Sequence, residues 1–519
     1  MTSTLVPDSA PFNEEQRAWL NGFLAGYLGV QSNGSADTAA TGNAALPAME
    51  EEEDLDDAAW HDSGLSIDER MTLAEGKPVA HRMMAAMAQL DCGSCGYVCK
   101  TYSAAIACGE ESNLTLCTPG GKETKQMLKK LAKESQSEES GSTSQSTAST
   151  DAASDASDSS NYSRKSPFAA SLIESRLLNR EGSAKDTRHV AIDLADSGIQ
   201  YEVGDALGVF PTNCPELVCE ILSHLQIACE SMITLDGAER PINEILERER
   251  CLKEPTDELL ELLIAKSSGD IQAKLEVMLE DGAPEGFDVL DALSLASSAS
   301  LTASELLETL PPLTPRLYSI ASSQRCVGDS QVHLTVGKVS YELDDRLRKG
   351  VASTMFSDRL ATGSEVRVFV QPNHAGFTVP VVDESPMIMV GPGTGIAPFI
   401  AFLQERQIRN ASGKNWLFFG DQRSEFDFLY QAELEEWQQT GLLTNLHTAF
   451  SRDGDQKVYV QDRMRENAAE IWQWLEEGAS FFVCGDAKRM AKDVDQALKK
   501  IVSQEGKLSD QEASDYVAK

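Results

Sequence analysis

The stretch Arg316-Leu317-Tyr318-Ser319-Ile320-Ala321-Ser322-Ser323 follows the proline-rich segment Pro311-Pro312-Leu313-Thr314-Pro315. Because proline disfavours a helix, we expect the stretch to begin as an extended strand. Its arginine offers a planar guanidinium that suits a diphosphate, its tyrosine a flat ring, and its serines hydroxyl groups. These side chains predict a strand that holds a flavin and its phosphates. An ordinary edge strand followed by a solvated serine tail is the alternative for this stretch taken alone.

The chain is long and strongly acidic. Its 519 residues allow about three domains at ~150 residues each. The 82 acidic side chains outnumber the 45 basic ones and give a net charge of −37, which disfavours binding to nucleic acid or to an anionic membrane. Residues 1–11 lack the basic and apolar parts of a signal peptide, and no run of about 20 apolar residues occurs. We therefore expect a cytoplasmic protein.

Five of the 11 cysteines lie between Cys92 and Cys117. Such clustering without a signal peptide favours metal or cluster ligation over disulfides. In Cys92-Gly-Ser-Cys95-Gly-Tyr-Val-Cys99 the glycines permit a tight turn that brings three thiolates together, and Cys117, two residues before a proline, supplies a fourth. Four sulfur ligands predict an iron–sulfur cluster. Structural zinc, which also accepts four thiolates, is the alternative, although zinc sites more often use two CxxC pairs.

Two stretches of low complexity separate the predicted folded parts. Segment 1–63 contains a short amphipathic helix at 12–29 followed by an acidic linker, and segment 134–163 consists almost entirely of small and acidic residues. We expect the second stretch to be a flexible tether, with a disordered interaction site as the alternative. Between them, segment 64–133 combines the cysteine cluster with helices expected at 67–90 and 125–133.

The rest of the chain predicts two larger domains. In segment 164–380, strands are expected on both sides of a helical block at about 215–310: at 168–177, 189–194, 206–209, 316–321, 332–338 and 365–370. This order predicts an antiparallel β-barrel with a helical insert. In segment 381–519, strands alternate with helices, beginning with a strand at 387–390 and a helix at 397–409. That alternation predicts a parallel α/β domain whose sheet is covered on both faces.

Three short motifs in the last domain have the chemistry of a nucleotide site. The turn Gly391-Pro392-Gly393-Thr394-Gly395 joins a strand to a helix whose amides can bind phosphate, although it lacks the GxGxxG fingerprint and a plain glycine turn is the alternative. Ser451-Arg452 and Lys457-Val458-Tyr459-Val460-Gln461 supply the cations and hydroxyls of a second phosphate site, which would select NADPH over NADH. A solvated loop is the alternative there. Cys484 ends a strand and could line a cleft or be inert core.

With these residues assembled, the chain from about 166 to 516 resembles the flavoprotein (alpha) subunits of NADPH sulfite reductase, within the diflavin reductase family. The resemblance rests on an ordered set of motifs: Tyr201-Glu-Val-Gly204-Asp205, Arg316–Ser319, Thr335–Gly337, Gly350–Ser353, Gly391–Gly395, Ser451-Arg452, Lys457–Gln461 and Cys484-Gly485-Asp486. It implies a ferredoxin-NADP reductase-like module with a helical connecting insert. Residues 64–124 are similar to small four-iron four-sulfur modules with the pattern CGxCGxxC…CxPGG.

The resemblance also implies roles for individual residues. The implied FAD-binding residues are Arg316, Leu317, Tyr318, Ser319, Thr335, Val336, Gly337, Tyr341, Gly350, Val351, Ala352 and Ser353. Of these, Thr335–Gly337 and Tyr341 would lie near the adenine, and Gly350–Ser353 would bind the diphosphate. The implied NADPH-binding residues are Gly391, Gly393, Thr394, Gly395, Ser451, Arg452, Lys457, Val458, Tyr459, Val460, Gln461 and Asp493. Ser319 and Cys484 would lie beside the hydride path as catalytic residues. Cys92, Cys95, Cys99 and Cys117 would hold a 4Fe-4S cluster.

Two departures from the family shape the expected function. No flavodoxin-like FMN domain precedes the FAD module, so we expect no FMN, and the chain stops at Lys519, where the family would still be in the helix before its aromatic C-terminal tail. We therefore expect a relay from NADPH to FAD, then to the cluster and on to the haemoprotein subunit of sulfite reductase, in sulfate assimilation. The alternatives are an electron donor to assimilatory nitrate reductase and a non-enzymatic zinc-binding scaffold.

Overall fold

The computed structural model describes residues 60–61, 65–90, 93, 95–111, 113–117, 119–139, 162–235, 237–373, 376–486 and 489–518. These residues all belong to one compact unit, 54–519. The helix predicted at 12–29, the acidic linker after it, most of the tether at 134–163 and Cys92 lie outside the described residues. No helix in the described ranges is both long enough and apolar enough to cross a lipid bilayer.

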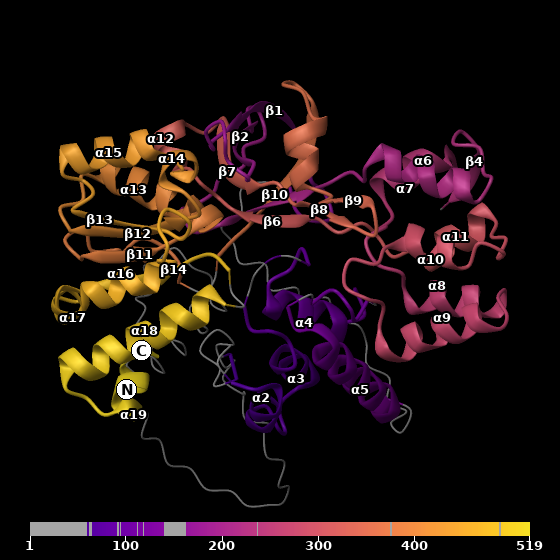
Figure 1. Cartoon of the computed structure of the whole chain (residues 1–519), viewed down its shortest axis with the longest axis horizontal. Helices are drawn as coiled ribbons and strands as arrows, with labels where there is room; N and C mark the ends of the chain where they lie inside the picture. Colours follow the sequence, from indigo (N-terminus) through magenta and orange to yellow (C-terminus); the bar gives the residue numbers. More distant parts are fainter. Residues whose placement is uncertain are drawn as a thin grey trace, which may run out of the picture. The chain divides into compact units, whose positions relative to one another are not determined.

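The first large domain is a six-stranded antiparallel sheet (Figure 1). Its strands, in the order β6-β3-β10-β1-β2-β7, are β6 (Arg316–Ser319), β3 (Ala206–Phe210), β10 (Glu365–Gln371), β1 (Phe168–Leu177), β2 (Thr187–Asp193) and β7 (Gln331–Gly337). An isolated antiparallel bridge between Ile320 and Leu334 joins the two outer strands, so the sheet closes on itself. Alternating residues such as Val190, Ile192 and Val368 fill its interior. The predicted antiparallel barrel is confirmed.

The insert between β3 and β6 has a hydrophobic core of its own, rich in leucine. Its helices are α6 (Pro215–His224), α7 (Ile242–Arg248), α8 (Asp257–Ala265), α9 (Asp270–Asp281), α10 (Val289–Leu295) and α11 (Ala303–Thr309). The prediction that the block is almost wholly helical was wrong at one place. Strands β4 (Met232–Leu235) and β5 (Ala238–Pro241) form a hairpin, because β-branched residues precede Gly237, whose φ of 78° suits a tight turn.

A second hairpin, which the sequence did not predict, connects the barrel to the insert. Strands β8 (Ser340–Leu343) and β9 (Arg346–Lys349) are joined through Asp344 and Asp345, both with positive φ. Arg346 and Arg348 donate to Asp291 at the start of α10, at 2.9 and 2.8 Å. The hairpin has few apolar residues, so these long-range ion pairs stabilise it in place of the buried hydrophobic side chains that usually do so. Short helices α12 (Gln324–Val327) and η2 (Met355–Arg359) complete the domain.

The second large domain is a parallel sheet in the order β13-β12-β11-β14, formed by Asn445–Phe450, Asn415–Asp421, Met387–Val390 and Ser480–Val483. Met389 and Phe419 face α13 (Ala397–Arg409) and α15 (Gln431–Thr440). Val390 and Phe418 face the opposite layer of α16 (Val460–Glu466), α17 (Ala468–Glu476), α18 (Met490–Gly506) and α19 (Asp510–Val517). Figure 1 shows the two helical layers on either side of the sheet, as predicted. Two short elements, η3 (Gly393–Ile396) and α14 (Ser424–Asp427), follow β11 and β12.

The cysteine-rich module is helical, with α2 (Ile67–Leu73), α3 (Val79–Ala85), α4 (Cys99–Ala107) and α5 (Gly121–Glu139) around a small core. The single helix expected at 67–90 is instead two helices. Gly76 has a φ of 77° and Pro78 is the N-cap of α3, and both end the first helix. Arg70 bridges the break, because it donates to the carbonyl oxygens of Leu65, Ala85 and Met87 at 2.6, 3.0 and 2.9 Å.

Substitution of Arg70 by leucine tests this bridge. We expect the opening free energy of the segment around Ala85 and Met87 to fall by about 3 kcal/mol, because buried carbonyl groups lose their donors. Hydrogen exchange of the full chain, followed by mass spectrometry, measures it. Arg82→Leu is the matched control: Arg82 on α3 forms a partly exposed ion pair with Glu134 on α5, and such pairs contribute little. Equal effects of the two substitutions would contradict the bridging role.

Candidate functional site

Strand β6 holds its side chains in fixed positions. Arg316 donates from Nη1 to the carbonyl oxygen of Thr314 at 2.8 Å and to the hydroxyl of the same residue at 2.9 Å. The ring of Tyr318 packs edge-on against Phe356, with centroids 6.2 Å apart, and burial raises the pKa of its hydroxyl to about 12. Tyr318 is therefore neutral at physiological pH. Ser319 ends the strand and is exposed.

The end of β6 meets the end of β14. Burial raises the pKa of the Cys484 thiol to about 11, and the nearby Ser319 hydroxyl partly opposes that shift. The backbone around Cys484 is packed so closely that a Cβ atom on Gly395 would lie 2.1 Å from the Cys484 carbonyl oxygen. The structure thus brings together the two residues predicted to flank the hydride path, with the thiol protonated at physiological pH. Their catalytic role stays a prediction.

The predicted diphosphate loop Gly350–Ser353 leads into η2. Gly350 has no room for a side chain, because an added Cβ would lie 2.6 Å from the Ser353 Oγ. The Ser353 hydroxyl accepts from the backbone N–H of Val339 at 3.1 Å. Arg359, which sequence reasoning missed, donates to the carbonyl oxygens of Thr212 and Val351 at 2.9 and 2.6 Å. It thereby connects the loop to the segment that follows β3. No local sequence pattern around Arg359 indicates this contact.

Thr335 lies in a buried network between the two large domains. Its hydroxyl is 2.7 Å from the Tyr430 hydroxyl, which is also 3.2 Å from Nδ1 of His189. Burial lowers the pKa of His189 to about 3 and that of His333 to about 4, so both rings are neutral at physiological pH. The side chain of Thr335, predicted to lie near the FAD adenine, therefore joins the barrel to the residue that precedes α15. Its contact with FAD stays a prediction.

The remaining predicted flavin residues differ in exposure. Val336 is buried in the barrel core and Ala352 is buried too, so each can offer a ligand only its backbone. Gly337 lies against Thr394, whose Cγ2 would be 3.1 Å from an added Cβ. The ring of Tyr341 is 47% exposed on the β8–β9 hairpin. An exposed aromatic ring in this position is suited to stack on an adenine.

The predicted nucleotide residues gather at the carboxyl edge of the parallel sheet. Gly391 follows β11 and has no room for a Cβ, which would lie 2.6 Å from the Gly395 carbonyl oxygen. Gly393 has a φ of 57°, as a turn that brings its backbone close to a ligand requires. Ser451 donates its backbone N–H to Asp421 at 2.9 Å, which holds the ends of β12 and β13 together. In open α/β sheets this edge is where nucleotides bind.

The cations predicted to bind the second phosphate are accessible. Arg452 and Lys457 are exposed, and Tyr459 is 45% exposed just before α16. Val460 is buried in the core of the domain. Gln461 donates to Asp493 at 3.3 Å, so these two predicted residues of α16 and α18 are in contact.

Asp421 provides a test of whether this edge fits a ligand. Its side chain is fully buried and forms an ion pair with Lys185 at 2.5 Å, and burial raises the pKa of its carboxyl group while Lys185 opposes that shift. Within the described part of the chain, its Oδ2 has no hydrogen-bond partner. That oxygen lies 3.9 Å from the position of a Cβ on Gly393. Because this oxygen is buried, a ligand at the edge does not reach it. The residues that fit the predicted ligand are instead the exposed Arg452 and Lys457, whose cations can bind phosphate.

The cysteine loop is tightly turned, as predicted. Gly93 and Gly96 have φ values of 63° and 79°, and the N–H of Gly96 donates to the Gly93 carbonyl oxygen at 2.9 Å. Burial raises the pKa of Tyr102, and Cys95 and Cys117 add to that shift, so both side chains lie near this one hydroxyl. Within the ranges described, which omit Cys92, no three His, Cys, Asp or Glu side chains are arranged to hold a metal ion. Ligation by Cys92, Cys95, Cys99 and Cys117 stays a prediction.

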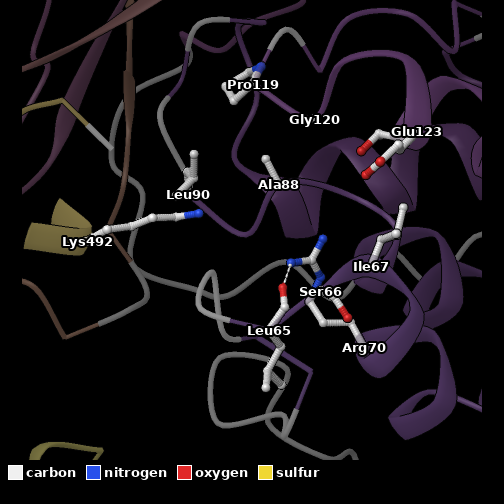
Figure 2. A pocket seen from close by; sticks show the side chains of 11 residues that line it. Leu65, Ser66, Ile67, Arg70, Ala88, Leu90, Pro119, Gly120, Glu123 and Lys492 are labelled. Atoms are coloured by element: carbon white, nitrogen blue, oxygen red, sulfur yellow. Dashed lines mark hydrogen bonds between the residues drawn. The ribbon is translucent and has the colours of Figure 1, made fainter. Parts of the chain in front are cut away.

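A cavity of about 270 Å³ borders the cysteine-rich module (Figure 2). Ser66, Arg70 and Gly120 line it from the module, and Lys492 extends into it from α18. The guanidinium of Arg70 is already bonded to carbonyl groups, among them that of Leu65. The residues that line the cavity include none of the predicted cofactor or metal residues, so we assign no function to it.

Comparison with known families agrees with this arrangement. Residues 160–355 match the family described as FAD binding domain, and residues 389–496 match the family described as oxidoreductase NAD-binding domain. The chain thus contains an FAD-binding domain followed by an NAD-binding domain. The two matches enclose β6, the Gly350–Ser353 loop and the carboxyl edge of the parallel sheet.

Several curated proteins are similar over the same extent. The chain is 44% identical over 363 residues to the sulfite reductase (NADPH) flavoprotein alpha-component of Cronobacter sakazakii, an alignment that covers 69% of this chain and 60% of that protein. Identity is 46% over 358 residues with the protein of the same description from Vibrio vulnificus (69% and 58%). Identity with the protein of the same description from Bacillus subtilis is 44% over 374 residues, which covers 69% of this chain and 60% of that protein. The chain spans about three-fifths of the length of these relatives.

The two buried histidines predict a pH dependence. Their folded-state pKa values lie below the unfolded value of about 6.5, so unfolding takes up protons as the pH falls below that value. Each histidine should lower the free energy of unfolding by about 1.4 kcal/mol per pH unit between pH 6.5 and its folded-state pKa. The difference in stability between the unmodified chain and His189→Asn should therefore shrink by that amount per unit below pH 6.5. Denaturant unfolding measures it, pH 8 gives the reference difference, and a pH-independent difference would contradict the assignment.

Proposed function

We propose that this chain is an NADPH-dependent flavoprotein reductase that supplies electrons to a sulfite reductase haemoprotein, with the cysteine-rich module as its one-electron exit. The observation that carries the proposal is the meeting of Ser319, at the end of β6, with Cys484, at the end of β14. A flavin on β6 and a nicotinamide at the edge of the parallel sheet would converge there. The similarity to sulfite reductase flavoproteins supports the choice of acceptor.

FAD, when bound, accepts a hydride from NADPH and releases its two electrons singly, which an iron–sulfur cluster requires. Arg316 and the backbone of Gly350–Ser353 would bind the diphosphate, and Tyr318 would provide a flat apolar face for the ring. Since burial raises the pKa of Cys484 to about 11, its thiol stays neutral and would orient the nicotinamide by contact, without acting as a base. The Ser319 hydroxyl would hold that thiol in place and donate to the flavin side of the junction.

The residues around the nucleotide edge would position NADPH. The Gly391–Gly395 turn lets the backbone approach a diphosphate closely. Exposed Arg452 and Lys457 would bind the 2′-phosphate, which is absent from NADH. In a chain whose net charge is −37, an exposed pair of cations in this position is a specific feature. Repulsion by the acidic surface would otherwise disfavour a phosphate.

The dinucleotide preference can be tested by substitution. We expect the Arg452→Ala/Lys457→Ala double variant to raise the KM for NADPH about 100-fold, since charge-assisted bonds to phosphate are lost. The KM for NADH should change less than about 3-fold. Ferricyanide reduction measures both constants. Lys499→Ala, which removes an exposed cation paired with Asp495 on α18, is the control and should leave both unchanged. An equal rise for NADPH and NADH would contradict the 2′-phosphate assignment.

The relay itself is tested by anaerobic titration of the purified chain with NADPH. We expect stoichiometric FAD, about four irons and no zinc per chain. Flavin absorbance should bleach first, and an electron paramagnetic resonance signal of a reduced cluster should follow. A colourless protein with zinc and no iron would overturn the proposal, and a reduced flavin beside an oxidised cluster would contradict the order of the relay. Adding a sulfite reductase haemoprotein or an assimilatory nitrate reductase then identifies the acceptor.

A further inference from the structure

The cysteine loop lies directly against strand β6. The backbone N–H of Leu317 points to the Gly93 carbonyl oxygen at 3.4 Å. A Cβ atom on Gly93 would lie 2.6 Å from the Cβ of Leu317, and one on Gly96 would lie 2.5 Å from the carbonyl oxygen of Pro315. The two glycines that turn the loop are therefore also its points of contact with the strand. Neither position has room for a side chain.

Arg164 holds the loop from the other side. Its guanidinium carbon lies 3.6 Å from the centre of the Tyr97 ring, and its Nη1 donates to the Gly96 carbonyl oxygen. Burial lowers the pKa of Arg164, and the nearby charge of Arg316 lowers it further. A desolvated guanidinium stacked on an aromatic ring and bonded to a carbonyl is a directional contact. It fixes the loop to the segment that leads into β1.

Helix α5 adds an electrostatic contact with the insert. Lys125 and Lys129 donate to Asp257, at the start of α8, at 3.0 and 2.5 Å. Lys122 on the same helix is paired with Asp281, at the end of α9, at 3.0 Å. Burial raises the pKa of Asp257, and the two lysines reverse that effect and lower it overall. A row of lysines thus faces acids of the insert in a chain that is otherwise strongly acidic.

We propose that these contacts form a built-in seat that holds the cysteine loop on the FAD strand, so that electrons leave the flavin through β6 with the module docked. The inference rests on the proposed function. Each transfer would move one electron from the flavin reduced by NADPH to a cluster held by the cysteines, and the proton that the flavin gained with the hydride would pass to solvent by the time the second electron has left. The contact at Leu317 lies between Arg316 and Tyr318, the two residues expected to hold the flavin. The lysine row of α5 and Arg164 define the position of the docked module.

Zero-length carbodiimide cross-linking of the full chain tests the seat without any need for cofactors. At low salt, peptide mass spectrometry should find Lys125 or Lys129 joined to Asp257, and 0.5 M NaCl should reduce the yield several-fold. Asp257→Lys should abolish the cross-link, and Asp257→Lys with Lys125→Glu and Lys129→Glu should restore it with the charges exchanged. The pair Lys414–Glu477, 2.6 Å apart in the NAD-binding domain, is the positive control in every variant. If the Lys414–Glu477 cross-link formed and the cross-link to Asp257 did not, the proposed seat would be contradicted.

Stopped-flow reduction by NADPH separates this inference from the proposed function. In Asp257→Lys we expect flavin reduction at the unmodified rate and cluster reduction slowed at least 10-fold, with recovery in the charge-exchanged triple variant. Unchanged cluster reduction in Asp257→Lys would overturn the seat as an electron path and leave the proposed function intact. If the chain contains FAD and NADPH does not reduce that flavin, the proposed function is contradicted. The cross-link would still report on the docking contact.

Discussion

The backbone of strand β6 is the constraint on which the rest of the structure depends. One edge of the strand pairs with β3, where Leu317 is opposite Gly208. Just beyond its end, Ile320 bridges to Leu334 and closes the barrel. The cysteine loop reaches the same strand at Leu317. A strand of only four residues with its backbone held in this way keeps a fixed position, and its side chains remain available for a ligand.

At each place where an anion or an acidic partner is expected to bind, the local charge is positive although the net charge of the chain is negative. The chain has a net charge of −37, yet Arg452 and Lys457 are both exposed in the segment that follows β13. The lysines of α5 face Asp257 and Asp281 in the same manner. Since interactions between exposed charges fade over about 10 Å at 0.1 M salt, such local arrangements decide specificity, and the net charge mainly sets solubility.

Elements with a local signal could be predicted from the sequence. Strand β11 and helix α13 have the predicted bounds, because an apolar run precedes the glycine turn, Pro398 lies in the first turn of the helix and Asn410 ends it in a left-handed conformation. The β8–β9 hairpin could not be predicted, since Arg346 and Arg348 are stabilised by Asp291, over 50 residues away. The hydrogen bond between Thr335 and Tyr430 is equally non-local. Ser319 and Cys484 were paired only through the family resemblance, because spacing alone says nothing about residues so far apart.

The glycines of the cysteine loop show how a local prediction can be right and incomplete. The sequence explains Gly93 and Gly96 by the tight turn that converging thiolates need, and their positive φ values agree. The structure adds a second reason, because both lie within contact distance of Pro315 or Leu317. A turn that satisfies both requirements couples the shape of the loop to its position on β6. If the cysteines bind a cluster, ligation would order the loop, and an ordered loop presents the Gly93 carbonyl to the strand. Assembly of the cluster would then favour docking, since a loop that has lost its turn forms neither contact.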